Sequence, residues 1–247
     1  MSTGSHTLRV CALYPDLMNI YADRGNIAVL RARCEWRGLG FELASSTLGE
    51  PLDGGGHDLF YMGGGQDRDQ AAVARDMVDT KRDALHSAAG RGAVVLAVCG
   101  GYQLLGHSYQ LGEEKLHGLG IADLETVRDP GPRLIGNVTI EAELGGAPRT
   151  IAGFENHGGR TYLGAGARPL GRVLSGFGNN GGDGLEGVHR DNLIGTYLHG
   201  PLLPKNAWLA DHLIGLALER RHGEKPELEP LDDTLERAAH ESAREAI

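Results

Sequence analysis

Apolar runs separated by glycine-rich breaks dominate the first hundred residues of the chain. Strands are predicted at the short apolar runs of residues 8–14, 41–44, 58–62 and 93–98. The last run is apolar throughout, which is typical of a parallel strand buried on both faces. Helical spacing of apolar positions occurs at residues 27–36 and 68–89, and Asp23 and Asn26 are predicted caps of the first of these helices. This order predicts an α/β fold with a mostly parallel sheet and helices on both faces.

The second half of the chain has a different pattern. Short strand-like runs lie between glycine-rich turns, at residues 138–143, 150–154, 171–175 and 193–198. We expect them to extend the same sheet with mixed or antiparallel strands, before an amphipathic helix at residues 208–218. We therefore expect one domain over residues 1–222 and a polar tail over residues 223–247. That tail is predicted to be solvated, with a loosely packed helix or a partner contact as alternatives.

Composition narrows the class of protein. Glycine accounts for 39 of the 247 residues, or about 16%, whereas its usual share is about 7%. This excess indicates many tight turns. The formal net charge of −9 argues against a nucleic-acid partner. The sequence has no apolar run of about 18 residues for a membrane span, and its first residues show no secretory segment. Three cysteines at no framework spacing indicate a reducing cytoplasm.

Cys99 has the most informative setting of the three cysteines. It is predicted to lie at the carboxyl end of a buried strand, which is where ligands bind in open α/β sheets. Gly100 and Gly101 follow it and allow a sharp turn into a helix, as in a nucleophile elbow. Backbone N–H groups at the start of that helix would favour the thiolate. We therefore interpret Cys99 as a nucleophile, and Cys11 and Cys34 as packing residues.

A nucleophilic thiol needs an adjacent base, and the chain has eleven histidines. His199 directly follows the strand-like run at residues 192–198, so it is expected at the same sheet edge as Cys99. His157 is the second candidate. The sequence contains no HExxH or CxxC pattern, so we predict covalent chemistry and no metal site.

The third candidate element is the glycine run at residues 63–65, at the end of a predicted strand. Such a loop can direct backbone N–H groups at a developing oxyanion, although an ordinary strand-to-helix turn has the same appearance. The chain contains neither a GxxxxGK[ST] phosphate loop nor a GxGxxG fingerprint after a strand. We therefore expect no nucleotide site and no cofactor in this chain.

Taken together, these elements resemble the class I glutamine amidotransferases over about residues 8–222. The string VCGGYQ at residues 98–103 is similar to the nucleophile elbow of that family, and YLHG at residues 197–200 is similar to the cobyric-acid-synthase-like branch. Three further segments resemble the amidotransferase subunit of lipid II isoglutaminyl synthase. They are YADRGN at residues 21–26, GFENHGGRT at residues 153–161, and residues 195–204.

The resemblance implies a role for each matching residue. Cys99 attacks the glutamine carboxamide and His199 transfers protons, while Gln103 and Arg133 bind the substrate. Arg133 would pair with the α-carboxylate of glutamine. The remaining implied group is the oxyanion hole, made of backbone groups of Gly64, Gly65 and Gly100.

The sequence departs from the family pattern at two positions. Many relatives carry an acidic residue two positions after the histidine, where this chain has Pro201. His199 then either works in a dyad or is oriented by another group, for which Glu155 is the candidate. Ala97 stands where many relatives have glycine.

The resemblance also implies a division of labour within a heterodimer. This chain would supply ammonia from L-glutamine, and a Mur-ligase-like synthetase subunit, called MurT in that system, would hold ATP and Mg²⁺. The pair would amidate the D-glutamate of lipid II at the cytoplasmic face of the plasma membrane, for peptidoglycan synthesis. The alternatives are an amidotransferase for another acceptor such as a corrinoid, a Cys hydrolase that does not use glutamine, and a non-catalytic binding module.

Overall fold

A central sheet of six strands organises the computed structural model, which describes residues 6–20, 23–111, 113–224 and 226–245. Its strand order is β13-β14-β4-β3-β1-β2. Five neighbouring strands are parallel and β13 is antiparallel at one edge. The strands are β1 (Thr7–Leu13), β2 (Gly40–Ser46), β3 (Leu59–Met62), β4 (Val94–Val98), β13 (Val188–Arg190) and β14 (Leu193–Thr196).

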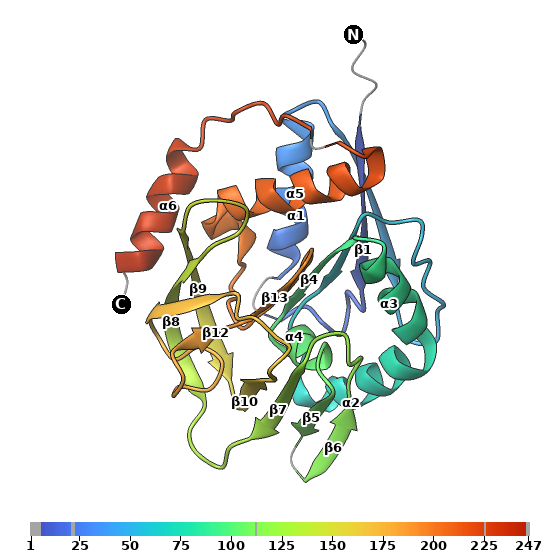
Figure 1. Ribbon diagram of the computed structural model, residues 1–247, viewed down its shortest axis with the longest axis vertical. Coiled ribbons are helices and arrows are strands. Elements are labelled where there is room, and N and C mark those ends of the chain that lie inside the picture. Colours follow the sequence, from blue (N-terminus) through green and yellow to red (C-terminus); the bar gives the residue numbers. More distant parts are fainter. Residues whose placement is uncertain (1–5, 21–22, 112, 225, 246–247) are drawn as a thin grey trace.

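Helices cover both faces of this sheet (Figure 1). Along the sheet, the step from β1 to β2 runs opposite to the step from β3 to β4. Right-handed crossovers therefore place the connecting helices on opposite faces. On one face, α1 (Arg24–Glu35) packs on α5 (Ala207–His222), which also contacts β1 and β4. The predicted parallel α/β core is confirmed, and every residue of β3 and β4 is buried.

The helix predicted over residues 68–89 is interrupted. It forms α2 (Asp67–Asp76), a π-helical turn η1 (Met77–Lys81) and α3 (Arg82–Gly90). The fully buried ammonium of Lys81 lies 2.5 Å from a carboxylate oxygen of Asp76 and donates to the carbonyl oxygen of Thr47 at 2.9 Å. An unpaired buried charge is costly, so these two contacts of the Lys81 ammonium favour the π-helical turn, which holds one residue more than an α-helical turn.

The second half of the chain corrects a prediction, because most of its strands do not extend the central sheet. Only β13 and β14 join it, whereas the others form two separate four-stranded sheets of order β10-β7-β5-β6 and β12-β11-β8-β9. Their bounds are β5 (Ser108–Leu111), β6 (Glu114–His117), β7 (Leu124–Arg128), β8 (Leu134–Ala142), β9 (Arg149–His157), β10 (Gly159–Leu163), β11 (Gly171–Ser175) and β12 (Leu185–Glu186).

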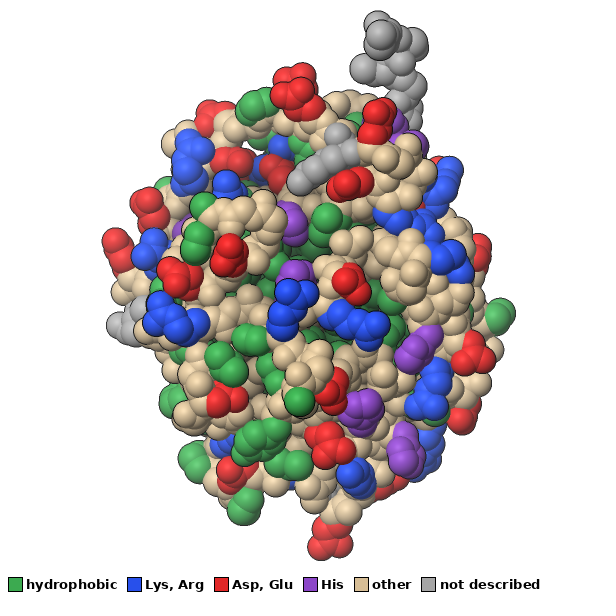
Figure 2. All heavy atoms as spheres, viewed as in Figure 1, with side chains coloured by type: hydrophobic (Ala, Val, Ile, Leu, Met, Phe, Trp, Pro, Cys, Tyr) green, Lys and Arg blue, Asp and Glu red, His purple; other side chains and the backbone are tan. Residues whose placement is uncertain are grey.

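The polar C-terminal segment contains a helix, α6 (Thr234–Glu245), that contacts β8 and β9. Its start is fixed by the buried guanidinium of Arg33, which lies 2.7 Å from Asp233 and 2.6 Å from Asp211. In the described ranges, no helix is both long and apolar enough to cross a bilayer. Basic and acidic side chains are mixed across the face shown in Figure 2.

Candidate active site

Cys99 stands at a sharp turn between β4 and the five-residue helix α4 (Gly100–Leu104). Its backbone dihedrals are φ 52° and ψ −109°, a region that favours glycine and that strains any residue with a side chain. The Cys99 N–H donates to the carbonyl oxygen of Thr196 on β14 at 2.8 Å, and the Gln103 N–H donates to the Cys99 carbonyl at 3.1 Å. These bonds hold the strained turn, and the predicted elbow is present.

Close packing around the turn requires small residues. A Cβ on Gly100 would stand 2.4 Å from the side-chain nitrogen of Gln70, and one on Gly101 would stand 2.8 Å from the Met62 carbonyl oxygen. A Cβ on Gly64 would lie 3.3 Å from the Cβ of Cys99. The glycine loop after β3 therefore lies directly beside the cysteine, as the sequence predicts.

His199 follows β14, the strand next to β4, so both candidate catalytic residues lie beyond the carboxyl ends of neighbouring parallel strands. Its backbone pairs with Phe154 through two hydrogen bonds, of 2.9 and 3.1 Å. Burial lowers the pKa of the His199 imidazole to about 4, and the positive charges of His157, Lys205 and Arg133 act in the same direction. The ring is therefore neutral at pH 7 and able to accept a proton.

A cavity in front of the elbow brings several predicted residues together. The Arg133 guanidinium is held by Asn156, through its side-chain oxygen at 2.7 Å and its carbonyl oxygen at 2.8 Å. Gln103, on α4, donates to the hydroxyl of Tyr197 at 3.1 Å. The residues that line the cavity are Ile20, Gly65, Gln70, Cys99, Gln103, Tyr109, Gln110, Arg128, Arg133, Asn156, His157, Gly158 and Gly159. His199 and Gly64 are not among them.

The predicted oxyanion groups differ in their hydrogen bonds. The Gly64 N–H donates to the carboxylate of Asp23 at 2.8 Å, so it is occupied in this structure. The backbone nitrogen of Gly65 lies 3.0 Å from the position of a Cβ on Gly100, which places these two residues together beside Cys99. The geometry therefore favours Gly65 and Gly100 over Gly64 as oxyanion donors.

Asp23 contacts the glycine loop, although the sequence analysis interpreted it only as a helix cap. Its side chain makes no capping hydrogen bond and instead holds the glycine loop. Burial raises the pKa of Asp23 to about 6, while the hydrogen bond from Gly64 opposes the shift. The string YADRGN was the only signal available, and its Tyr21 and Ala22 lie outside the described residues.

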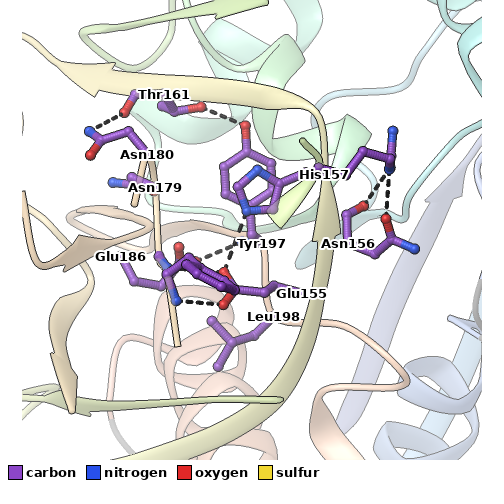
Figure 3. Close-up of polar contacts among 12 residues, drawn as sticks. Glu155, Asn156, His157, Thr161, Asn179, Asn180, Glu186, Tyr197 and Leu198 are labelled. Atoms are coloured by element: carbon purple, nitrogen blue, oxygen red, sulfur yellow. Dashed lines mark hydrogen bonds and ion pairs between the residues drawn. The ribbon is translucent and has the colours of Figure 1, made fainter. Parts of the chain in front are cut away.

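Glu155 lies in a buried polar network that Figure 3 shows. Its carboxylate accepts backbone N–H bonds from Phe177 at 2.6 Å and Gly178 at 3.0 Å, and it lies 3.5 Å from a ring nitrogen of His157. These contacts associate Glu155 with His157. That Glu155 also orients His199 stays a prediction.

A second buried carboxyl, Glu186, was not predicted. It accepts hydrogen bonds from the Thr196 hydroxyl and the Tyr197 N–H, both at 2.7 Å, and thereby fixes the chain just before His199. Burial raises the pKa of Glu186 to about 8. In the parts of the chain that the structure describes, no group of three His, Cys, Asp or Glu side chains is arranged to hold a metal ion.

Comparison with known proteins gives a consistent family. A model described as the CobB/CobQ-like glutamine amidotransferase domain matches residues 9–207. The subunit GatD of lipid II isoglutaminyl synthase (glutamine-hydrolyzing) from Streptococcus pneumoniae is 38% identical over 231 residues, which cover 93% of this chain and 88% of that protein. GatD from Staphylococcus aureus is 42% identical over 217 residues, which cover 87% of this chain and 86% of that protein.

Two further similarities are weaker, the first because it covers a smaller share of both chains and the second because its identity is lower. A cobyric acid synthase from Pelotomaculum thermopropionicum is 40% identical over 156 residues, which cover 57% of this chain and 28% of that protein. Among solved structures, a chain of PurLQS from Thermotoga maritima matches with a TM-score of 0.55 and 20% identity, over 85% of this chain and 95% of that one. This structural likeness supports the fold alone.

Proposed function

Since the chain belongs to the CobB/CobQ-like glutamine amidotransferases, we propose that it is the glutamine-hydrolysing subunit of a lipid II isoglutaminyl synthase. It converts L-glutamine to glutamate and ammonia. A Mur-ligase-like synthetase subunit, MurT, then uses the ammonia to amidate the α-carboxylate of D-glutamate in lipid II, which gives D-isoglutamine for peptidoglycan. Similarity to two GatD proteins over most of their length supports this assignment.

The observation that carries the chemistry is the position of Cys99. The cysteine is held in a strained turn at the wall of a cavity, beside Gln103 and Arg133. His199 reaches the same sheet edge from the neighbouring strand in its neutral form. A thiol and a fixed guanidinium in one cavity, with a base at the same sheet edge, fit the covalent hydrolysis of glutamine.

The reaction proceeds by two acyl transfers. The Cys99 sulfur attacks the side-chain carboxamide carbon of glutamine while His199 accepts the thiol proton. The tetrahedral oxyanion is stabilised by the backbone N–H groups of Gly65 and Gly100, and its collapse expels ammonia with the proton from His199. His199 next takes a proton from water, which attacks the thioester, releases glutamate and restores the thiol.

Arg133 and Gln103 bind the substrate in this scheme. The Arg133 guanidinium pairs with the α-carboxylate of glutamine, and Asn156 holds that guanidinium in place. Gln103 is oriented by Tyr197, whose hydroxyl contacts Thr161 at 2.7 Å. Orientation before reaction lowers the entropic cost of placing the carboxamide against the sulfur.

The partner subunit supplies carboxylate activation. Amide formation from a carboxylate needs an activated intermediate, and this sequence contains no phosphate loop. ATP and Mg²⁺ are therefore assigned to the synthetase subunit. The heterodimer acts in the cytoplasm, at the inner face of the plasma membrane where its lipid substrate lies.

The test of this division is mass spectrometry of lipid II incubated with the chain, glutamine and ATP, with and without the partner. We expect the amidated product only when both subunits are present. Cys99→Ala should block product formation from glutamine, and free ammonia at high concentration should restore it. The matched control, Cys11→Ala, should support the reaction. Amidated product from this chain alone would contradict the division of labour.

A different acceptor is the second candidate, because the chain also shares part of its length with cobyric acid synthases. In that case glutamine hydrolysis persists but lipid II stays unamidated with every Mur-ligase-like partner. A corrinoid acid would then be the next substrate to test.

A further inference from the structure

Gln70 is a cavity residue that the reaction scheme does not use. It lies in the first turn of α2, where its backbone N–H donates to the carbonyl oxygen of Gln66 at 3.1 Å. The residue is 3% exposed and lines the same cavity as Cys99. Among the residues that the structure describes, none donates a hydrogen bond to its buried side-chain oxygen, Oε1. A buried amide oxygen without a donor is costly, so this atom is a candidate for contact with a ligand.

The side-chain amide of Gln70 is held against the nucleophile elbow. A Cβ on Gly100 would stand 2.4 Å from the Gln70 Nε2, and a Cβ on Gly65 would stand 3.5 Å from the Gln70 Cγ. Because both positions are glycine, the Gln70 side chain can pack against the backbone that presents Cys99. Gly65 and Gly100 are also the proposed oxyanion donors. The amide therefore lies at the end of the cavity where the carboxamide of the substrate reacts.

Substrate and product differ chemically at this end. The carboxamide of glutamine carries an NH2 group that donates hydrogen bonds, whereas the carboxylate of glutamate has acceptor oxygens only. An amide oxygen without a partner is satisfied by the carboxamide. The carboxylate leaves it unpaired and repels it. A site that hydrogen-bonds one group of its substrate discriminates strongly against an analogue that lacks this group.

We propose that Gln70 is a specificity-determining residue, whose Oε1 accepts a hydrogen bond from the carboxamide nitrogen of glutamine and thereby selects glutamine over glutamate. The inference rests on the proposed function, because it assigns the group that recognises the reacting end of that substrate. The hydrogen bond is lost once ammonia leaves, since the carboxylate formed by hydrolysis has no donor. Gln70 therefore also favours release of the product.

The test compares the binding of glutamine and glutamate by isothermal titration calorimetry in Cys99→Ala protein, which is expected not to consume glutamine. On that background, Gln70→Met keeps the length of the side chain but removes the acceptor. The preference for glutamine, taken as the ratio of the two Kd values, should fall by roughly 10-fold, because the bound carboxamide is left with an unpaired donor. The matched control is Gln66→Met, at the exposed N-cap of the same helix, which should leave the ratio unchanged.

Gln70→Glu distinguishes an acceptor from a merely structural side chain. Its carboxylate can accept from the carboxamide and repels a second carboxylate, so this variant should keep the preference that Gln70→Met loses. Equal loss in both variants, with thermal unfolding showing that both are folded, would overturn the proposal. An unchanged ratio in folded Gln70→Met would also overturn it. Gln70→Ala removes the same acceptor without adding bulk, and it carries the same expectation if the methionine variant does not fold.

Kinetics give an independent measurement in protein that retains Cys99. Gln70→Met should raise KM for glutamine more than it lowers kcat, because the contact forms on binding. Inhibition by glutamate, relative to KM for glutamine, should become stronger. A protein that neither binds nor hydrolyses glutamine would defeat the proposed function and this inference with it. Hydrolysis with an unchanged ratio of the inhibition constant to KM in Gln70→Met would defeat the inference alone.

Discussion

The two residues proposed to be catalytic are positioned by regions of opposite character. Cys99 follows a strand whose five residues are all buried and apolar, and its geometry is set by backbone bonds and closely packed glycines. His199 lies in a region of buried polar groups, where Glu186 fixes the preceding residues and Glu155 holds His157. The nucleophile is positioned by shape, and the base by charge and hydrogen bonds. Substitutions in the two regions should therefore have different effects on activity and stability.

The largest effect is expected at Cys99. Cys99→Ala should reduce glutamine hydrolysis to background, because no other group can form the thioester, while the fold persists. Glutamate release measures this loss. Cys11 and Cys34 are buried, and burial raises their pKa values to about 11 and about 12. Their alanine variants should stay active if they fold, and full activity in Cys99→Ala would disprove covalent catalysis.

The next largest effect is expected at His199. Removal of a general acid–base group typically lowers the rate by about 10²–10⁴-fold, and His199→Ala should lose at least that much in glutamate release. His157→Ala should lose less, because His199 is the residue assigned as the base. If His157→Ala is the more damaged variant at equal thermal stability, the roles of the two histidines are reversed.

An intermediate effect is expected at Arg133. The contact proposed between Arg133 and the substrate carboxylate would form before the reaction and persist during it. Arg133→Ala should therefore mainly raise KM and lower kcat/KM by roughly 10- to 100-fold. Glutamine titrations separate the two constants. Arg172→Ala is the matched control, because Arg172 forms an exposed ion pair with Glu141 on β8. Unchanged kinetics in Arg133→Ala would remove this residue from the site.

The smallest effect on rate, and a distinct effect on stability, is expected at Asp23. Burial raises the pKa of Asp23 to about 6, so the Asp23 carboxyl group binds a proton more tightly in the folded protein than in the unfolded chain. The contribution of Asp23 to stability therefore falls as the pH rises from about 4 through about 6. Asp23→Asn can still accept the bond from Gly64 and should lose this dependence.

Thermal unfolding at pH 5 and pH 7.5 tests that expectation. The difference in Tm between Asp23→Asn and the unaltered protein should grow in favour of the variant at the higher pH. A variant that is less stable only at pH 7.5 would show that the charge itself stabilises the loop.

The difference between the two regions also explains what could be predicted from the sequence. The elbow at Cys99 was visible because one apolar strand and two glycines are adjacent in the chain. The position of His199 followed from a strand pattern that ends at the same edge. Arg133 was named only through a family resemblance, since nothing local distinguishes it from a surface arginine.

The remaining features depend on contacts between distant segments. The burial of Asp23 and Glu186 cannot be inferred from their neighbours in sequence, because acidic residues are normally exposed. The separate sheet of β8 and β9 also escaped prediction, since a strand pattern shows that a strand exists but not which partner it pairs with. The π-helical turn η1 is accompanied by a tertiary contact between Lys81 and Thr47, which the local sequence does not reveal.

The backbone at Cys99 has a consequence for how this sequence can change over evolutionary time. Glycine adopts its dihedrals without strain, so a Cys99→Gly change relieves the backbone while it removes the sulfur. At this position, selection for folding stability and selection for chemistry favour different residues. In a lineage that no longer needs ammonia production, a Cys99→Gly change would remove the nucleophile without a cost in backbone strain. The residue found at this turn is therefore a sensitive marker of whether a related chain is still an enzyme.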